Sequence, residues 1–154
     1  MPATVERLGI ENAGLALEMV QRLLTELGEE GDELGALDSP KILEAWARSR
    51  DDVHIFVARV SGGQPVGITT VVESFAIYAN GNYGIINEMY VDPSHRSSGV
   101  GRRLIQAVKE FGVERRWTRI EVTAPESERW ARTRAFYKRE GFRCAGPKLK
   151  LLLS

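Results

Sequence analysis

The middle of the chain, residues 83–111, reads YGIINEMYVDPSHRSSGVGRRLIQAVKEF. Its first part, Tyr83 to Val91, follows an Asn-Gly turn and is typical of a strand. Its last part, Val100 to Phe111, has apolar residues at helical spacing, which predicts a helix with one buried face. A loop that contains Gly99 and Gly101 joins the two elements. The segment therefore predicts a strand, a tight loop and a helix in succession.

The elements on either side of this segment predict a mixed sheet. Val53 to Val60 and Val66 to Phe75 are rich in β-branched residues and flank the turn sequence Ser-Gly-Gly-Gln, which indicates a hairpin. Together with Tyr83 to Val91 they form an antiparallel meander. The central helix leads to Trp117–Thr123, where apolar and polar residues alternate as in a strand. Because a strand-helix-strand connection joins parallel strands by a right-handed crossover, this strand is expected to lie parallel to Tyr83–Val91.

The remaining elements surround this sheet. We expect helices at Glu11 to Leu27, Ser39 to Ser49 and Ser127 to Glu140, and strands at Thr4 to Leu8 and Phe142 to Leu153, the last interrupted at Gly146-Pro147. Ser39 is the expected N-cap of its helix, and Gly28 to Asp38 is the expected loop before it. The chain, residues 1–154, is therefore predicted to be a single α/β (α+β) domain, with a central mixed, mostly antiparallel sheet flanked by helices.

Composition places the chain among soluble globular proteins. It has 154 residues, of which 43% are hydrophobic and 27% charged, so it suits one domain with a real core. We find neither an apolar stretch long enough to cross a bilayer nor a secretion signal, and we expect no membrane association. The single cysteine, Cys144, excludes an intramolecular disulfide, and a cytoplasmic protein is the expectation. Two histidines, far apart, do not form a zinc motif, so we expect no metal.

The loop between the central strand and helix is suited to binding an anion. Unpaired backbone N–H groups and the positive end of the helix meet there, and two glycines allow close approach. Arg96, Arg102 and Arg103 add positive charge. The sequence of a P-loop is absent, and Leu104 stands where a dinucleotide-binding fingerprint has its third glycine. A phosphate-bearing ligand other than these nucleotides is therefore indicated.

Two motifs resemble those of the GNAT N-acetyltransferase superfamily. Arg-x-x-Gly-x-Gly at Arg96 to Gly101, after a strand that ends in Val-Asp-Pro, is similar to the acetyl-CoA-binding motif of that superfamily. Ala135 to Phe142, AFYKREGF, is similar to a second signature near its C-terminus. The order of elements agrees as well, so the resemblance covers nearly the whole chain. Many members have an asparagine seven residues before the tyrosine of this signature and an alanine four before it, where this chain has Trp130 and Thr133.

The resemblance implies acetyl-CoA as the acyl donor and assigns residues to it. Tyr137 would lie near the sulfur of coenzyme A as a general acid. Backbone groups of Met89, Tyr90 and Val91 would hold the pantetheine arm. The loop that follows would hold the pyrophosphate, and it consists of Arg96, Ser97, Ser98, Gly99, Val100, Gly101 and Arg102.

The chemistry of acetyl transfer points to Glu88 as a general base. An alkylammonium must lose a proton before it can attack a thioester, and a carboxylate or an ordered water must accept that proton. On a strand, Glu88 and Tyr90 share one face, and Met89 and Val91 share the other. The resemblance also places a catalytic glutamate of many members at Glu88. The alternatives are a surface or ion-paired Glu88, a Tyr137 that is only packed under the sheet, and Glu73 as a weaker acid or base.

The charges divide unevenly along the chain. Residues 1–94 contain 6 Lys or Arg and 15 Asp or Glu, and residues 95–154 contain 15 and 6, so the two parts carry net charges of −9 and +9. The basic part contains the loop expected to bind phosphate. The acidic part includes Gly28 to Asp38, which in the family borders the acceptor site, so we hypothesise a cationic acceptor such as a polyamine, an aminoglycoside-like compound or a lysine-containing peptide. A solvated acidic loop is the alternative.

The leading hypothesis is therefore an acetyl-CoA-dependent N-acetyltransferase that acts on a primary amine, from a small molecule or a peptide, by direct attack in a ternary complex. The alternative is a non-catalytic acyl-CoA-binding sensor or assembly subunit. Nucleic-acid binding is disfavoured, because the net charge is zero and no recognition motif is present. The family often forms dimers, and Leu149 to Leu153 is a candidate edge strand for a homodimer, although a buried strand explains it equally well.

The cationic-acceptor hypothesis predicts the effect of neutralising the acidic loop. Replacing Glu29, Glu30, Asp32 and Glu33 by neutral residues is expected to raise the KM for a polycation, because the negative field that attracts it is weakened. Steady-state kinetics with a polyamine would measure this change. An unchanged KM would contradict the hypothesis.

Overall fold

A computed structural model describes residues 2–28 and 37–153. Within these residues, five strands form one sheet in the order β1-β2-β3-β4-β5. They are β1 (Thr4–Leu8), β2 (Val53–Arg59), β3 (Pro65–Ala76), β4 (Gly81–Val91) and β5 (Ile120–Val122). The first four pair antiparallel and β5 pairs parallel with β4, which confirms the predicted mixed sheet.

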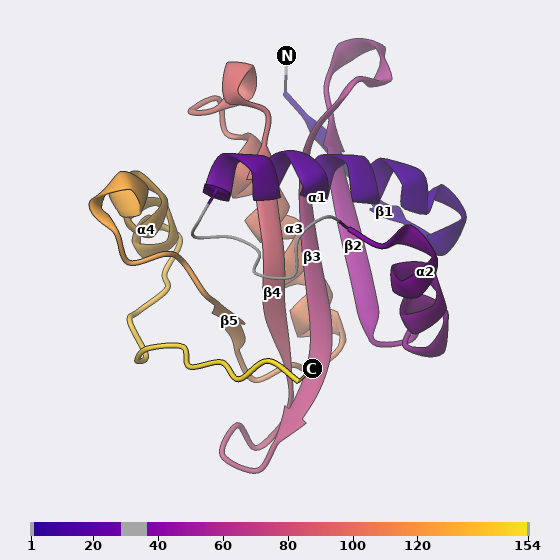
Figure 1. Ribbon diagram of the computed structural model, residues 1–154. Helices are drawn as coiled ribbons and strands as arrows, with labels where there is room; N and C mark the ends of the chain where they lie inside the picture. The colour runs from indigo at the N-terminus through magenta and orange to yellow at the C-terminus, as the bar shows by residue number, and fades with distance from the viewer. Residues whose placement is uncertain (1, 29–36, 154) are drawn as a thin grey trace.

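Helices cover both faces of the sheet. They are α1 (Ala13–Leu27), α2 (Ser39–Arg48), α3 (Val100–Glu114) and α4 (Ala131–Arg139). Figure 1 shows α1 across the front of the sheet, α3 behind it, and α4 to the side of β4 and β5. In the described part of the chain, none of these helices has the length and apolar character needed to span a membrane.

Alternate residues of β2 build a separate apolar core on each face of the sheet. Phe56 and Ala58 belong to the cluster with α3, whereas Ile55 and Val57 belong to the cluster with α1 and α2. The α3 cluster includes the predicted helical stripe of Val100, Leu104, Ile105 and Val108, all buried. On the other face, Met19 of α1 and Trp46 of α2 are buried. The packing thus confirms the helical periodicity predicted for the segment that forms α3.

Two local predictions are corrected. The cap of α2 is Asp38 and not Ser39, because the Asp38 carboxylate accepts a hydrogen bond from the Lys41 N–H at 3.1 Å, and Ser39 and Pro40 begin the helix. The strand predicted within Trp117–Thr123 is shorter, and only Ile120–Val122 pairs. Of the predicted loop at 28–38, residues 29–36 lie outside the described part of the chain, including the four acidic residues that we proposed to neutralise.

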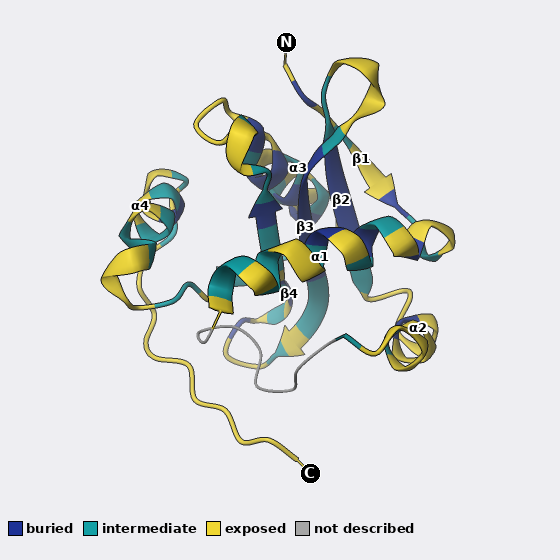
Figure 2. Ribbon diagram, turned by 45° about the horizontal axis from the view of Figure 1, so that its top comes forward, coloured by how far each residue is buried: buried dark blue, intermediate teal, exposed yellow. Residues whose placement is uncertain are grey.

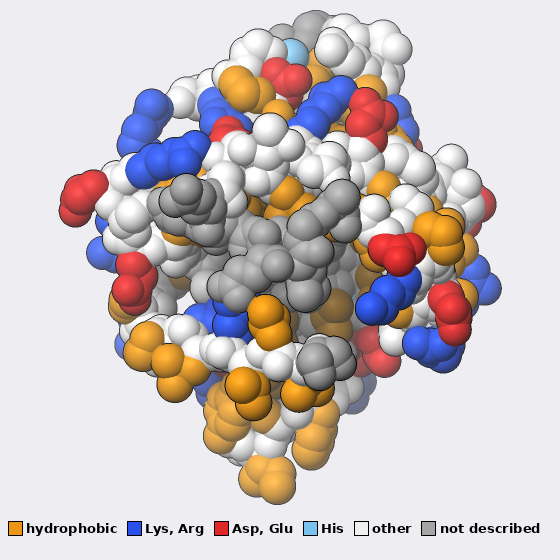
Figure 3. Space-filling view, in the orientation of Figure 1, with side chains coloured by type: hydrophobic (Ala, Val, Ile, Leu, Met, Phe, Trp, Pro, Cys, Tyr) orange, Lys and Arg blue, Asp and Glu red, His pale blue; other side chains and the backbone are white. Residues whose placement is uncertain are grey.

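The prediction of a strand from Phe142 to Leu153 is wrong. This segment forms no strand, and Figure 2 shows it as an exposed tail beside α4. Gly146 has φ +124° and Pro147 has no N–H, so two adjacent residues interrupt strand pairing. Leu149, Leu151 and Leu153 are therefore largely exposed instead of buried. In Figure 3, hydrophobic side chains gather toward the lower end of the molecule, where this tail and the β3–β4 hairpin lie.

β4 is long, but it is paired with β5 over only a few residues. Gly84, Ile85 and Ile86 pair with β5, whereas Asn87–Val91 continue beside β3 alone. The β3–β4 register shifts after Ile86, so Asn87 has no partner on β3. This bulge changes which face the following side chains take. Beyond it, Tyr90 packs with the α1 cluster, and Met89 and Val91 pack with the α3 cluster.

Trp117 lies between β4 and α3 where the β4–β5 pairing begins. A Cβ on Gly84 would be 2.3 Å from Trp117 Cζ3, and a Cβ on Gly112 would be 2.8 Å from Trp117 Cε3. The indole Nε1 donates to Glu73 at 2.6 Å. Glycine is therefore required at both positions so that the indole fits beside the sheet.

This contact predicts that Gly84→Ala destabilises the protein. The added methyl group overpacks Trp117, so we expect the free energy of unfolding to fall by about 1–3 kcal/mol in urea denaturation. Gly14→Ala in α1 is the matched control, because a Cβ there has no atom within 4 Å and a helical alanine stabilises by about 0.5–1 kcal/mol. Equal stability of the Gly84→Ala variant and the parent would contradict the proposed packing.

Candidate active site

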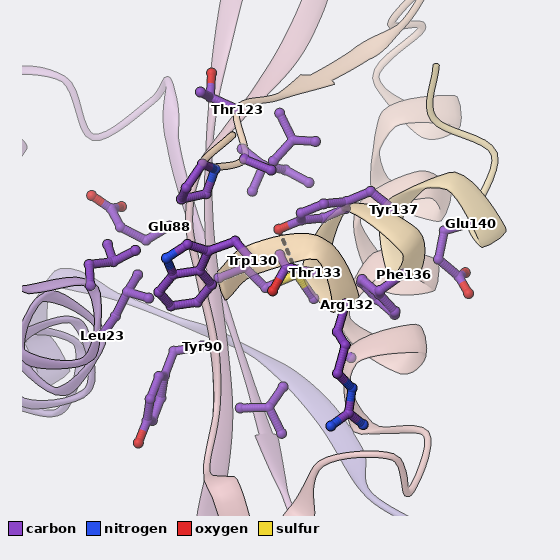
Figure 4. Close-up of a pocket in the computed structure, with 18 of the residues that line it drawn as sticks. Leu23, Glu88, Tyr90, Thr123, Trp130, Arg132, Thr133, Phe136, Tyr137 and Glu140 are labelled. Atoms are coloured by element: carbon purple, nitrogen blue, oxygen red, sulfur yellow. Dashed lines mark hydrogen bonds between the residues drawn. The ribbon is translucent and has the colours of Figure 1, made fainter. Parts of the chain in front are cut away.

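A cleft of about 1270 Å³ lies where β4 and β5 separate. Its walls come from the C-terminal end of α1, the β4 edge from Ile86 to Val91, the start of α3, and α4 with the segment before it. Figure 4 shows side chains from these elements around it. Of the sequence-predicted residues, the cleft brings together Glu88, Met89, Tyr90, Val91, Arg96, Ser97, Gly99, Gly101, Arg102 and Tyr137.

The first turn of α3 opens onto this cleft. Gly99 is the N-cap with φ +89°, in the left-handed region that favours glycine. The Arg103 N–H donates to Gly99 O at 3.0 Å, so the N–H groups of the three residues between them have no acceptor within the helix. A Cβ on Gly101 would be 3.1 Å from Phe136 Cζ, so this glycine also allows α3 and α4 to approach. The arrangement suits an anion at the helix N-terminus.

Arg96 is engaged by protein groups. Its Nε donates to Val91 O at 2.8 Å, and its guanidinium contacts both carboxylate oxygens of Glu26 at 2.5 and 2.7 Å. Arg129 also donates to the Glu26 backbone carbonyl, at 2.5 Å. Glu26 therefore ties the end of α1 to the loop before α3 and to the segment before α4. The sequence does not predict this pairing of Glu26 with Arg96, because an ion pair between residues far apart in the chain leaves no local pattern.

Two residues of the predicted loop do not line the cleft. The Val100 side chain is buried against the sheet, where a Cβ on Gly67 would lie 3.0 Å from its Cγ1. The Ser98 hydroxyl donates to the His95 carbonyl. These side chains shape the turn, and only their backbone groups remain for a ligand.

Glu88 is fixed by two threonines of β3. The Thr70 hydroxyl donates to the Glu88 carboxylate, and the Glu88 N–H donates to Thr70 Oγ1 at 3.1 Å. Thr69 Oγ1 donates to Glu88 O at 3.0 Å. Burial raises the pKa of Glu88, while the Thr70 hydrogen bond and the charge of Lys148 lower it. Sequence reasoning missed Thr70, because the bulge at Asn87 decides which β3 residue faces Glu88.

Tyr137 of α4 is buried in the wall of the cleft that lies across from Glu88 (Figure 4). Its ring packs on Phe136 and Phe142 with centroid distances of 5.3 and 5.5 Å. Its hydroxyl donates to Met89 Sδ at 3.5 Å, the contact drawn in Figure 4. Burial raises its pKa to about 12, so the phenol is protonated at neutral pH.

Glu73, the weaker acid or base candidate, lies outside the cleft. It contacts Arg115 at 2.9 and 3.0 Å and accepts from Trp117 at 2.6 Å. The hydrogen bond from Arg115 lowers its pKa, as expected for an ion pair. In the described residues, no group of three or more His, Cys, Asp or Glu could hold a metal ion.

A family model matches the part of the sequence that forms β2 to α4. Residues 51–144 match the acetyltransferase (GNAT) domain model. The chain belongs to the GNAT acetyltransferase family. A curated relative, the IAA acetyltransferase of Azospirillum brasilense, is 30% identical over 133 residues, which cover 84% of this chain and 80% of the relative. An uncharacterized N-acetyltransferase of Archaeoglobus fulgidus is 28% identical over 98 residues, which cover 64% of this chain and 65% of that protein.

Solved GNAT structures share the fold. An aminoglycoside acetyltransferase, HMB0005, from an uncultured soil metagenomic sample is 21% identical, has a TM-score of 0.81, and aligns over 100% of both chains. The ribosomal-protein-alanine N-acetyltransferase of Brucella melitensis biovar Abortus 2308 is 18% identical, with a TM-score of 0.76 over 99% of this chain and 100% of that one. At these identities the likeness establishes the fold alone. The chain is an acetyltransferase of the GNAT type.

Proposed function

We propose that this protein transfers the acetyl group of acetyl-CoA to a primary amine by direct attack in a ternary complex. One observation carries the proposal. A half-buried carboxylate, Glu88, and a buried protonated phenol, Tyr137, line the same cleft as the free N-terminus of α3. One cleft thus offers a base and an acid for the transfer step, and a helix N-terminus for the phosphates of the donor.

The donor would bind along the edge of β4 and over the start of α3. Backbone groups of Met89, Tyr90 and Val91 would hold the amides of pantetheine, since β5 does not pair with this stretch. The pyrophosphate would be held by the first turn of α3 and the loop before it, through Ser97, Ser98, Gly99, Val100, Gly101 and Arg102. Arg96 would keep this loop in place through Glu26 and Val91.

Glu88 would act as the general base, directly or through water. It accepts a proton from the acceptor ammonium, and the neutral amine nitrogen then attacks the thioester carbonyl carbon. As the C–N bond forms, the C–S bond breaks and the electron pair leaves on sulfur. Because burial raises the pKa of Glu88, its carboxylate is a stronger base than an exposed one.

Tyr137 would act as the general acid. Its O–H now donates to Met89 Sδ, a weak acceptor, and a thiolate is a far better one. The phenol donates its proton to the sulfur as the C–S bond breaks, and the second proton of the attacking nitrogen restores the phenol through water, so the products are an N-acetyl amine and the coenzyme A thiol. Its raised pKa keeps this proton in place at neutral pH.

The acceptor in this proposal is a small-molecule or peptide amine. Solved structures with the same fold include aminoglycoside acetyltransferases and a ribosomal-protein-alanine N-acetyltransferase, which supports an amine acceptor. The cationic acceptor expected from the sequence depends on acidic residues outside the described part of the chain. The choice among amine acceptors therefore rests on the described side chains that line the cleft.

Thermal unfolding with acetyl-CoA tests the donor site. Ligand at 100 times its Kd stabilises the native state by about 2.7 kcal/mol, so we expect a clear rise in Tm. Adenosine diphosphate and a dinucleotide serve as ligand controls. We expect the Gly99→Glu/Gly101→Glu variant to lose the shift, because two carboxylates would face the phosphates. Gly14→Glu, at an exposed position of α1, is the matched variant that keeps it.

No shift in the parent protein at saturating acetyl-CoA would overturn the proposal. A shift together with a thioester that stays intact for hours with diverse amines would instead support the non-catalytic sensor.

Thr70→Val tests the role of Glu88 through pH dependence. The base must be deprotonated, so kcat/KM rises with pH through the pKa of Glu88. Removing the Thr70 hydroxyl removes a hydrogen bond that lowers this pKa, so the acid limb is expected to move to higher pH. Thr69→Val is the matched control, because Thr69 bonds only to the Glu88 carbonyl. Glu88→Gln is expected to lower kcat by about 10²- to 10⁴-fold. An acid limb that does not move in Thr70→Val would exclude Glu88 as the titrating base.

A further inference from the structure

Trp130 forms an apolar wall in the cleft, next to the proposed base. It ends the short turn Glu128–Trp130 before α4, and it lines the cleft together with Leu23 of α1 and with Glu88 and Tyr90 of β4. Figure 4 shows the indole extending from the α4 side toward Leu23. The Arg129 guanidinium lies 5.2 Å from the indole centroid and covers part of the ring. A flat apolar group of a substrate would find a matching surface here.

The indole also presents a buried donor. Trp130 Nε1 is buried, and no described residue accepts a hydrogen bond from it. A buried N–H without an acceptor costs about 1–3 kcal/mol, so such groups usually have a partner.

Lys148 brings a positive charge into the cleft that contains Glu88. Lys148 lines the cleft and is the cation whose charge acts on the Glu88 carboxylate. It comes from the tail after α4, which the sequence had predicted to be a strand. The cleft thus presents both a carboxylate and an ammonium. An amine that carries its own carboxylate has the complementary arrangement of charges.

Basic side chains outnumber acidic ones among the described residues that line the cleft. Among the described residues, Arg129, Arg132, Lys148 and Lys150 line the cleft, together with the acidic residues Glu26, Glu88 and Glu140. A second ammonium on the acceptor would meet like charges, and such juxtaposition costs several kcal/mol.

From these observations we infer that the acceptor is an α-amino acid with an apolar, preferably aromatic, side chain. Its amine would lie at Glu88, its carboxylate at Lys148, and its side chain on Trp130. This inference rests on the proposed function and names the acceptor class of the same site. Trp130 and Lys148 would be specificity-determining residues that take no part in the chemical step.

Four primary amines test the two contacts separately. L-Phenylalanine has both groups, phenethylamine lacks the carboxylate, L-alanine lacks the ring, and putrescine lacks both. Thiol release would be followed for each, with the product identified by mass spectrometry. We expect kcat/KM for phenylalanine to exceed that for phenethylamine and for alanine by about tenfold each, and that for putrescine by more, because each lost contact is worth about 1.4 kcal/mol.

Two variants assign each preference to its residue. Lys148→Met is expected to remove the preference for phenylalanine over phenethylamine and to keep the preference over alanine. Trp130→Ala is expected to do the reverse, and Trp130→Phe to restore part of the ring preference without the N–H. Lys41→Met in α2, away from the cleft, is the matched charge control.

The outcomes separate this inference from the function on which it rests. Loss of the acetyl-CoA shift in Tm would overturn the proposed function itself. An intact shift with putrescine or phenethylamine as the best acceptor would leave acetyl transfer standing and overturn the amino acid inference. An intact shift with no product from phenylalanine would also overturn it. Unchanged selectivity in Lys148→Met and Trp130→Ala would show that these residues do not choose the acceptor.

Discussion

β4 and β5 run side by side for only three residues and then separate, and the rest of the site depends on this divergence. A parallel pair that stayed closed would satisfy the edge of β4 with backbone bonds from β5. Because the strands separate, the edge from Asn87 to Val91 borders a cleft into which α1, α3 and α4 all project. Trp117, packed against Gly84 and Gly112, occupies the place where pairing begins. The packing of one indole on two glycines therefore helps to determine where the sheet opens.

The bulge at Asn87 adds a second constraint. It shifts the alternation of β4, so that Tyr90 joins the α1 core while Met89 and Val91 join the α3 core. Glu88 is left beside Thr70, which fixes its carboxylate and moderates the rise in its pKa caused by burial. Met89 in turn contacts Tyr137. One extra residue in a strand thus places the half-buried Glu88 carboxylate and the Met89 contact of Tyr137 on the same cleft.

The ion pair between Glu26 and Arg96 joins the two halves of the cleft. Glu26 lies at the end of α1, and Arg96 precedes the anion-binding turn of α3. Exposed ion pairs contribute little to stability, but here one Arg96 nitrogen contacts both Glu26 carboxylate oxygens, and Arg129 donates to the Glu26 carbonyl. In our proposal, its main effect is positional, because it holds the donor loop against the helix that forms the acceptor wall.

The sequence by itself determined the order of elements as far as α4, the helical stripe of α3, the mixed sheet and the glycine loop at Gly99. These features depend on local periodicity and on backbone conformation, which neighbouring residues encode. It also placed Glu88 and Tyr90 on one face of β4. Only the tertiary structure decided that Thr70 faces Glu88, that Glu26 holds Arg96, and that the final segment is a tail carrying Lys148 to the cleft instead of a strand. These contacts join residues far apart in the chain, and they depend on a bulge, a strand divergence and a Gly-Pro interruption whose positions follow from packing and not from local pattern.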